Sequence, residues 1–355
     1  MATRTALKVC WDLGRRALGS DSTISQGRHP SPADNSWQVS TPQPLAPVCA
    51  VIVTYHPDLG ILRSAVTAIH GQVQRIVIVD NGSPQDTVSR LRHIAADVGA
   101  HLIPSQKNLG VAAGHNLGIA WARRQGCTHV LLLDQDSVAG PNMVAELLAA
   151  HHDLTARGVR VAAVGPRYED PVSGHTSFFV RFGRLKFKRI HCTPRHCGER
   201  VEVDFLITSG SLISLAALDH IGGMDEDLFI DHVDTEWCLR ARSKGYRAFG
   251  ICDAVMHHTL GSETLRVWLW RWRFVPRHSP LRHYYVFRNS LLLYRRPYVP
   301  TAMILNDIVR LMFMLVFYSL RTAPRREHAR MMIKGLIDGL RGRTGPFPSQ
   351  SAVER

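Results

Sequence analysis

The chain has 355 residues, of which 45% are hydrophobic and 20% are charged. A chain of this length and apolar content can bury at least one large core, so the composition excludes a disordered, collagen-like or disulfide-stapled protein and suits one or two domains. The formal net charge is +14, and most of it lies after residue 260, where 17 Lys and Arg face 5 Asp and Glu. Such a basic excess attracts phosphate, whether in nucleic acid, in anionic lipid or in a phosphorylated substrate.

Residues 1–47 do not have the pattern of a folded domain. They contain no apolar segment of the kind found in secretory signals, and residues 20–47 are rich in Ser, Pro, Gln and Asn. We therefore interpret residues 1–47 as a disordered leader or linker.

The seven cysteines are scattered, odd in number and without a CxxC pair. This pattern predicts reduced thiols in a cytosolic protein. Cys192 and Cys197 are each preceded by a histidine, His191 and His196. Four donors of this type are able to bind a metal ion, but the spacing around Pro194 does not match a tetrahedral zinc knuckle, which favours an ordinary loop.

From residue 48 onward, short β-branched apolar runs alternate with segments of helical spacing. Strands are expected at 48–55, 75–83, 100–103, 129–137 and 161–165, and helices at 57–72, 84–98, 111–125 and 141–156. This alternation predicts an α/β fold with a mostly parallel sheet and helices on both faces. The alternation fails at 167–200, where loops or a short ribbon are expected. Order returns with the apolar segment 203–214 and with a helix whose first turn carries acids near Asp234.

Acidic residues follow two of these strands. Ligands bind beyond the carboxyl ends of the strands in an open parallel sheet, so Tyr55, Asp80, Asp134 and Asp136 are expected along one edge. Asp80 suits a hydrogen bond to a nucleobase or ribose, and equally a cap for the helix that begins near Pro84. Asp134 and Asp136 leave the same face of an extended segment and can share a divalent cation, which favours a nucleotide diphosphate as the partner.

Five motifs occur in a fixed order: TYHPD (54–58), VDNGS (79–83), NLGVAAGHNLG (108–118), LLDQDS (132–137) and FIDHVDTEWCLR (229–240). Together they resemble the inverting family 2 glycosyltransferases, and within them the bacterial rhamnosyltransferases of O-antigen and exopolysaccharide assembly. The segment SPLRHYYVFRN (279–289) also resembles the end of that subgroup. The resemblance implies a GT-A type nucleotide-binding domain over residues 48–260, followed by a basic, aromatic-rich helical region over 261–355.

The resemblance also implies roles for single residues. The nucleotide would be contacted by Thr54, Tyr55, Asp80, Asn81, Asn108, Gly110, Gly114 and Asn116. Mg²⁺ or Mn²⁺ would be bound by Asp134, Asp136 and His258. Asp234 would be the catalytic base with Asp231 as the second candidate, and Glu236 and Trp237 would lie near the acceptor. The alternatives that need no ligand are a glycine-rich loop built for tight packing, a surface histidine and a solvated acidic helix start.

An inverting transferase needs one carboxylate to take the proton from the acceptor hydroxyl, which attacks C1 of the sugar from the face opposite the diphosphate. A metal ion and basic groups stabilise the charge that develops on the diphosphate. The resemblance implies dTDP-L-rhamnose as the donor and a glycan or polyprenyl-diphosphate-linked acceptor. Another dTDP- or UDP-sugar is the alternative donor.

The basic tail combines arginines and tryptophans with an apolar run at 311–320. That run is too short to span a bilayer alone, and the longer window from Thr301 includes Asp307 and Arg310. Arginines and aromatic residues beside an apolar helix suit an anionic membrane surface, which predicts a cytoplasmic enzyme that is peripheral on the inner face of the cell membrane. The alternative is a helical hairpin that packs on the catalytic domain or on a second subunit of a homo-oligomer.

A basic nucleic-acid-binding protein is the rival interpretation from a different class, because of the net charge of +14. The sequence has no zinc-finger or RNP-like motif, and the basic residues are mixed with tryptophans and an apolar run. We therefore expect no nucleic acid partner.

Overall fold

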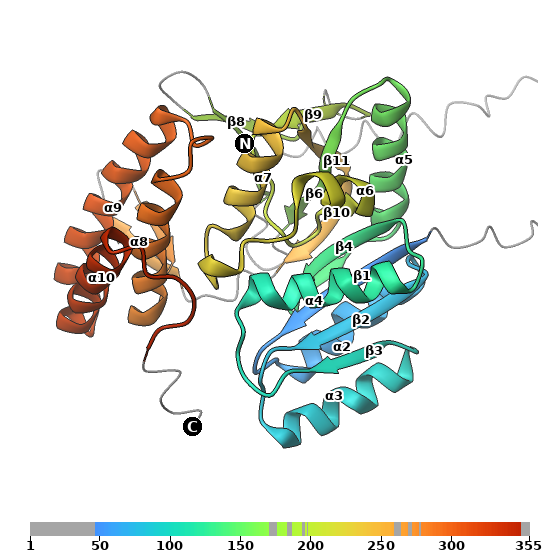
Figure 1. The fold of residues 1–355 in the computed structure, drawn as a ribbon, viewed down its shortest axis with the longest axis horizontal. Coiled ribbons are helices and arrows are strands. Elements are labelled where there is room, and N and C mark those ends of the chain that lie inside the picture. The colour runs from blue at the N-terminus through green and yellow to red at the C-terminus, as the bar shows by residue number, and fades with distance from the viewer. Residues whose placement is uncertain are drawn as a thin grey trace, which may run out of the picture. The chain divides into compact units, whose positions relative to one another are not determined.

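The structure is a computed structural model of the chain (Figure 1). It describes residues 47–169, 176–182, 187–193, 196, 198–258, 264–268, 272–276 and 278–348. Residues Leu45–Arg355 form one compact unit. The leader predicted at 1–47 lies outside the described residues, apart from Pro47.

A nine-stranded sheet forms the centre of this unit. Its order is β3–β2–β1–β4–β10–β6–β11–β5, and β9 pairs with β11. The strands β3, β2, β1 and β4 are parallel, and so are β6 and β11, whereas β10 runs antiparallel to β4 and β6. The predicted α/β fold with a mostly parallel sheet is confirmed. The strands are β1 (Val48–Thr54), β2 (Arg75–Asp80), β3 (His101–Pro104), β4 (His129–Asp134), β5 (Ser137–Ala139), β6 (Val161–Glu169), β9 (Arg200–Val203), β10 (Leu212–Ser214) and β11 (Arg247–His258).

Helices cover both faces of the sheet (Figure 1). On one face are α2 (Leu59–His70), α3 (Gln85–Asp97) and α5 (Met143–Ala156), and on the other are α4 (Val111–Arg124), α6 (Leu215–Ile221) and α7 (Val233–Ser243). Strand β1 supplies both cores, because Val51 and Val53 pack on the α4 side while Ala50 and Ile52 pack on the α2 side. This is the alternation expected of a strand buried on both faces.

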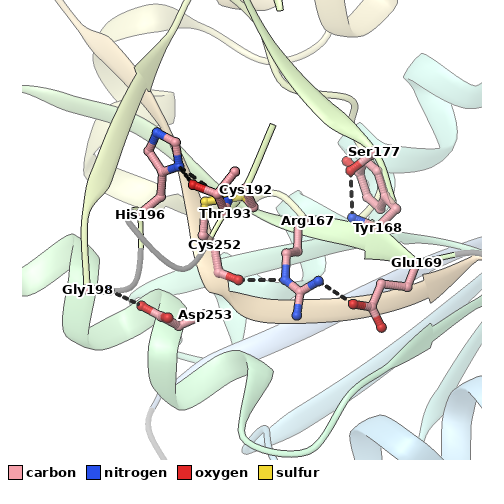
Figure 2. Close-up of a disulfide and its surroundings, with 10 residues drawn as sticks. All are labelled: Arg167, Tyr168, Glu169, Ser177, Cys192, Thr193, His196, Gly198, Cys252 and Asp253. Carbon is pink, nitrogen blue, oxygen red and sulfur yellow. Dashed lines mark hydrogen bonds and ion pairs between the residues drawn. A yellow bond between two sulfur atoms is a disulfide. The ribbon is translucent and has the colours of Figure 1, made fainter. Parts of the chain in front are cut away.

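The segment 167–200 contains the short ribbon that the sequence allowed. Strands β7 (Phe178–Phe182) and β8 (Phe187–His191) pair antiparallel. Just after β8, Cys192 forms a disulfide with Cys252 of β11, with a Cα–Cα distance of 5.6 Å (Figure 2). The prediction of reduced thiols is therefore wrong for this pair, which 60 residues separate in the sequence and only the tertiary fold brings together.

The disulfide also removes Cys192 from the metal cluster considered at 191–197. His196 contacts the Thr193 hydroxyl through Nδ1 at 2.9 Å, which fits the ordinary loop (Figure 2). Cys197 and Cys10 lie outside the described residues. The remaining cysteines, Cys49, Cys127 and Cys238, are free and buried.

The C-terminal region contributes a two-stranded hairpin and three helices. Strands β12 (Thr264–Trp268) and β13 (Trp272–Pro276) pair antiparallel, and α8 (Pro280–Tyr294), α9 (Thr301–Arg321) and α10 (Arg325–Leu340) pack together (Figure 1). The apolar run at 311–320 is thus the second half of a 21-residue helix. In the described part of the chain, α9 is the one helix long and apolar enough to cross a membrane, with a mean hydropathy of 1.7 and 22% of its apolar window buried.

Candidate active site

A cleft of about 470 Å³ lies beyond the carboxyl ends of β1, β2 and β4. Parallel pairing aligns these ends, because Thr54 is opposite Asp80 and Val53 is opposite Asp134. Residues from the later chain close the other side, mainly the segment 229–234. Of the predicted site residues, the cleft is lined by Thr54, Tyr55, Asn81, Asn108, Gly110, Asp134, Asp136, Asp231 and Asp234.

Asp80 is fully buried and does not line the cleft. Its oxygens accept hydrogen bonds from the Thr54 hydroxyl at 3.1 Å and from the Ser83 N–H and hydroxyl at 2.9 and 2.6 Å. Asp80 therefore holds the turn that follows β2, and its contact with a nucleotide stays a prediction. The next residue, Asn81, does reach the cleft, and its Oδ1 accepts from the Leu109 N–H at 2.8 Å.

The turn before α4 requires glycine at position 110. Gly110 has φ of +88°, and a Cβ there would lie 2.5 Å from the carbonyl oxygen of Phe229. The Asn108 Oδ1 accepts from the Gly110 N–H at 2.9 Å, and the Val111 N–H donates to the same Phe229 carbonyl at 2.8 Å. The turn thereby connects the part of the cleft formed by β1, β2 and β4 to the segment 229–234.

Gly114 and Asn116 do not line the cleft, and their contact with the nucleotide stays a prediction. A Cβ on Gly114 would lie 2.8 Å from the Val53 side chain, so glycine there allows α4 to pack closely on β1. Asn116 instead bonds the backbone of Met224, accepting from its N–H at 2.8 Å and donating to its carbonyl at 2.9 Å. Both sets of contacts fit the alternative of a loop and helix built for tight packing.

The residue between them, His115, does line the cleft, and its role could not be foreseen from the sequence. Its side chain is fully buried, and within the described residues neither ring nitrogen has a hydrogen-bond partner. Burial lowers the pKa of His115 to about 4, so the imidazole is neutral at pH 7. A neutral imidazole offers a ligand one donor and one acceptor.

Asp134 and Asp136 both line the cleft, and the residue between them is engaged elsewhere. Gln135 accepts from the Tyr55 N–H through Oε1 at 2.8 Å, while the Asp134 N–H donates to the Ser209 hydroxyl at 3.0 Å. Paired carboxylate oxygens at a solvent-accessible cleft fit a hard divalent cation. His258 ends β11 opposite Ser137, but its side chain lies outside the described residues.

The segment that carries Asp231 and Asp234 has a strained backbone. Phe229, Asp231 and His232 have φ values of 64°, 60° and 64°, which are costly for residues with a Cβ. Such a conformation persists only where neighbouring groups hold it in place. His232 then begins α7, and Asp234 projects from the first turn of that helix into the cleft.

Two buried side chains of α8 hold this segment. The Asn289 amide nitrogen donates to the carbonyl oxygens of Leu228, Ile230 and Asp231 at 2.8, 2.6 and 3.1 Å. Arg288 adds a bond from Nη2 to the Leu228 carbonyl at 3.0 Å. The predicted C-terminal region therefore helps to form the cleft, and it also contributes Arg282 to the lining.

The two candidate bases differ in their surroundings. Burial raises the pKa of Asp234, the charge of Asp231 adds to this shift, and a 2.7 Å hydrogen bond from the Thr235 N–H opposes it. Asp231 is paired with Arg282, whose Nε and Nη2 lie 3.2 and 3.1 Å from Oδ1. Of the two carboxylates, Asp234 is better suited to accept a proton near neutral pH.

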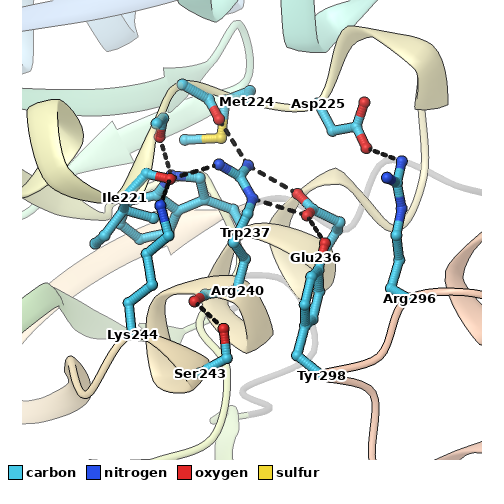
Figure 3. A network of polar contacts seen from close by, with 12 residues as sticks. Ile221, Met224, Asp225, Glu236, Trp237, Arg240, Ser243, Lys244, Arg296 and Tyr298 are labelled. Atoms are coloured by element: carbon cyan, nitrogen blue, oxygen red, sulfur yellow. Dashed lines mark hydrogen bonds and ion pairs between the residues drawn. The ribbon is translucent and has the colours of Figure 1, made fainter.

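Glu236 and Trp237 are buried and do not line the cleft, and their contact with the acceptor stays a prediction. Glu236 is buried, and its carboxylate accepts hydrogen bonds from Nε and Nη2 of Arg240, at 2.8 and 2.9 Å, and from the Tyr298 hydroxyl (Figure 3). The Trp237 indole donates to the Gly222 carbonyl at 2.9 Å. Both side chains lie on faces of α7 that pack into the protein, whereas Asp234 faces the cleft.

A second cavity, of about 380 Å³, borders the cleft at His232. Its lining is rich in aromatic and basic side chains from the ribbon, from the segment that follows β9 and from α9. They include Phe178, Phe182, Arg189, Phe205 and Arg310. The ribbon residues carry no periodic pattern in the sequence, which is why the sequence analysis did not single them out.

Comparison with known proteins agrees with this geometry. Residues 49–222 match the model of the family described as glycosyl transferase family 2. The chain is 31% identical over 302 residues to the dTDP-rhamnosyl transferase RfbF of Shigella flexneri, a match that covers 84% of this chain and 97% of the relative. The chain belongs to glycosyl transferase family 2. The family resemblance seen in the motifs is confirmed, and the enzyme interpretation holds over the nucleic-acid-binding one.

Other family members and solved structures extend the comparison. Galactofuranosyltransferase GlfT1 of Mycobacterium tuberculosis is 27% identical over 259 residues, covering 70% of this chain and 83% of the relative. The structure of GalNAc-T7 with UDP, GalNAc and Mn²⁺ has a TM-score of 0.52 at 13% identity, and the match covers 84% of this chain but 56% of that one. The structure of S. aureus TarS 1–349 with UDP-GlcNAc has a TM-score of 0.50 at 15% identity, with 83% and 80% covered. The fold is therefore of the GT-A type.

Replacing Asn289 by Ala tests whether α8 holds the site. Loss of the amide leaves the carbonyls of the strained segment unpaired, so we expect the free energy of unfolding to fall by about 1–3 kcal/mol and sugar transfer to fall as well. Denaturant unfolding and a transfer assay at equal folded fraction measure both effects. Asn306→Ala, which removes one amide bond to the Ala302 carbonyl within α9, is the control for stability. Unchanged stability and transfer in Asn289→Ala would contradict this role.

Proposed function

We propose that this protein is an inverting, metal-dependent glycosyltransferase that moves L-rhamnose from dTDP-L-rhamnose to a glycan or lipid-linked acceptor in cell-surface polysaccharide assembly. The observation that carries the proposal is the presence of the Asp134 and Asp136 pair and of Asp234 on the walls of one cleft. The similarity to a dTDP-rhamnosyl transferase over 97% of that relative supports the donor.

The donor would occupy the side of the cleft formed by β1, β2 and β4. Asp134, Asp136 and His258 would hold Mg²⁺ or Mn²⁺, which supplies positive charge to the diphosphate when bound. Thr54, Tyr55, Asn81, Asn108 and Gly110 would contact the nucleotide. Arg282, the one arginine that lines the cleft among the described residues, faces the same space and is suited to a phosphate oxygen.

Asp234 would act as the base. In its ionised form it accepts the proton of the acceptor hydroxyl as the oxygen attacks C1 and the bond from C1 to the diphosphate breaks. Its raised pKa makes the ionised carboxylate a stronger base than an exposed aspartate. Asp231, held by Arg282, would orient that arginine instead of taking the proton.

The acceptor would enter through the second cavity, on the other side of His232 from the cleft. Aromatic side chains there offer flat apolar surfaces to a sugar ring, and Arg189 and Arg310 offer hydrogen-bond donors to its oxygens. This cavity replaces Glu236 and Trp237 as the proposed acceptor site.

A membrane surface is the partner proposed for the C-terminal helices. One face of α9 exposes large apolar side chains, including Val309 and Val316 at 62% and 59%, while exposed arginines follow at 321, 325, 326 and 330. An apolar groove of about 220 Å³ runs between α8, α9 and α10. Apolar area beside basic residues fits an anionic lipid surface on the cytoplasmic side, where a polyprenyl-diphosphate-linked acceptor would reside.

A panel of nucleotide sugars tests the donor and the metal together. We expect dTDP-L-rhamnose, in the presence of Mg²⁺ or Mn²⁺, to raise the melting temperature and to be slowly hydrolysed, and excess chelator to abolish both effects. Asp136→Asn should weaken the metal-dependent response at least tenfold. A stronger response to another dTDP-sugar or to a UDP-sugar would establish the alternative donor, and full turnover in chelator would overturn the metal proposal.

Two isosteric variants separate the candidate bases. Asp234→Asn should reduce transfer by about 10²- to 10⁴-fold without loss of donor binding. Asp231→Asn should keep transfer, but the acid limb of its pH–rate profile should move to lower pH. Removing the charge of Asp231 lowers the pKa of Asp234, so the base stays ionised in more acidic solution. Initial rates across pH measure both. Near-normal turnover in Asp234→Asn would contradict the assignment of Asp234 as the base. Loss of turnover in Asp231→Asn alone would identify Asp231 as the base instead.

Sedimentation with lipid vesicles tests the membrane surface. Phosphatidylglycerol vesicles should carry down more protein than phosphatidylcholine vesicles, and Val309→Glu with Val316→Glu should abolish the difference. Ile61→Glu with Leu117→Glu makes the same charge change at exposed apolar residues elsewhere and should leave binding intact. Equal sedimentation with both lipids, together with a dimer that the α9 variant dissociates, would favour the homo-oligomer instead.

A further inference from the structure

Three histidines gather at the end of β4 that is remote from the cleft. His129 begins this strand and Asp134 ends it, while His151 and His152 come from α5. One ring nitrogen of each lies within 4.8 Å of those of the others. His129 and His151 are buried, and His152 is exposed. None of the three has a role in the proposed sugar transfer.

The spacing of the two buried rings matches that of metal ligands. His129 Nε2 and His151 Nδ1 are 3.4 Å apart. Two nitrogens that bind one tetrahedral zinc ion at about 2.0–2.1 Å are about 3.3–3.4 Å from each other. The third ring can approach the same point, because the exposed His152 side chain is free of close packing on its outer side.

The surroundings also orient His129 as a ligand. The Thr128 hydroxyl donates to the Pro47 carbonyl at 3.3 Å and lies 2.9 Å from His129 Nδ1, so it is an acceptor for an Nδ1–H. This contact leaves the lone pair of Nε2 directed at His151, as second-shell hydrogen bonds do in metal sites. Burial and the neighbouring histidines lower the pKa of His129 to about 4, and burial does the same for His151, so both rings are neutral at pH 7.

We propose that His129, His151 and His152 bind a zinc ion, with solvent in the fourth position. Three imidazoles suit Zn²⁺ and other borderline transition metals, and they bind Mg²⁺ poorly because that ion prefers oxygen ligands. The site is distinct from the pair of aspartates in the cleft, since the length of β4 separates them. A bound ion would link α5 to the start of β4, at the end of the strand opposite the cleft.

Zinc titration of the untagged full-length chain tests the site, with stoichiometry from calorimetry. Wild type and Asp136→Asn should both bind zinc at the histidine site, and Asp136→Asn separates it from zinc bound in the cleft. His152→Ala should lose one equivalent or bind it at least tenfold more weakly, and its exposed position protects the fold. His93→Ala, at an exposed histidine of α3, is the matched control and should behave as wild type.

Cobalt substitution gives a second readout that does not depend on activity. The visible absorption of four-coordinate Co²⁺ should appear in wild type and in Asp136→Asn, and should disappear in His152→Ala. Equal zinc stoichiometry and affinity in wild type and His152→Ala, or an unchanged cobalt spectrum, would overturn the proposal and leave a packed histidine pair at this position.

Discussion

The hydrogen bonds from α8 to the backbone of residues 228–231 are the constraint on which the site depends. Three residues of the segment 229–232 have positive φ although each carries a Cβ, and this conformation is costly on its own. The buried Asn289 amide donates to three carbonyl oxygens of residues 228–231, and for those of Ile230 and Asp231 it is the donor that the structure shows. The position of Asp234 in the first turn of α7 therefore depends on the side chain of Asn289, which lies 55 residues further along the chain.

The cleft concentrates negative charge, which accounts for the arginine in its lining and for its suitability for a cation. Asp134, Asp136, Asp231 and Asp234 all line it, and like charges at close range repel one another. Arg282 offsets part of this charge by pairing with Asp231. In the proposed function a bound divalent cation would offset the negative charge of the aspartates. The diphosphate of the donor would then be neutralised by that cation and by Arg282.

The basic tail divides into parts with different tasks. Two arginines of the predicted tail belong to the site: Arg282 lines the cleft, and Arg288 bonds the loop beside it. Part of the net charge of +14 therefore lies at the site and not on the outer surface of the tail. The arginines after α9 stay exposed beside an apolar face. Charge counted along a sequence cannot separate these parts, because burial depends on which helix packs against which loop.

The sequence by itself determined the strands now labelled β1, β2, β3, β4 and β6, the order of the motifs, and the edge of the sheet along which Tyr55, Asp80, Asp134 and Asp136 lie. These follow from local signals, since apolar runs and helical spacing specify elements, and parallel pairing brings their carboxyl ends together. Only the tertiary structure shows that Gly114 packs on Val53, that Asn116 bonds Met224, that Glu236 and Trp237 are buried, that Cys192 is bonded to Cys252, and that His115 and Arg282 line the cleft. Each of these outcomes depends on contacts between residues far apart in the chain, and no periodicity or spacing within a single segment records such contacts.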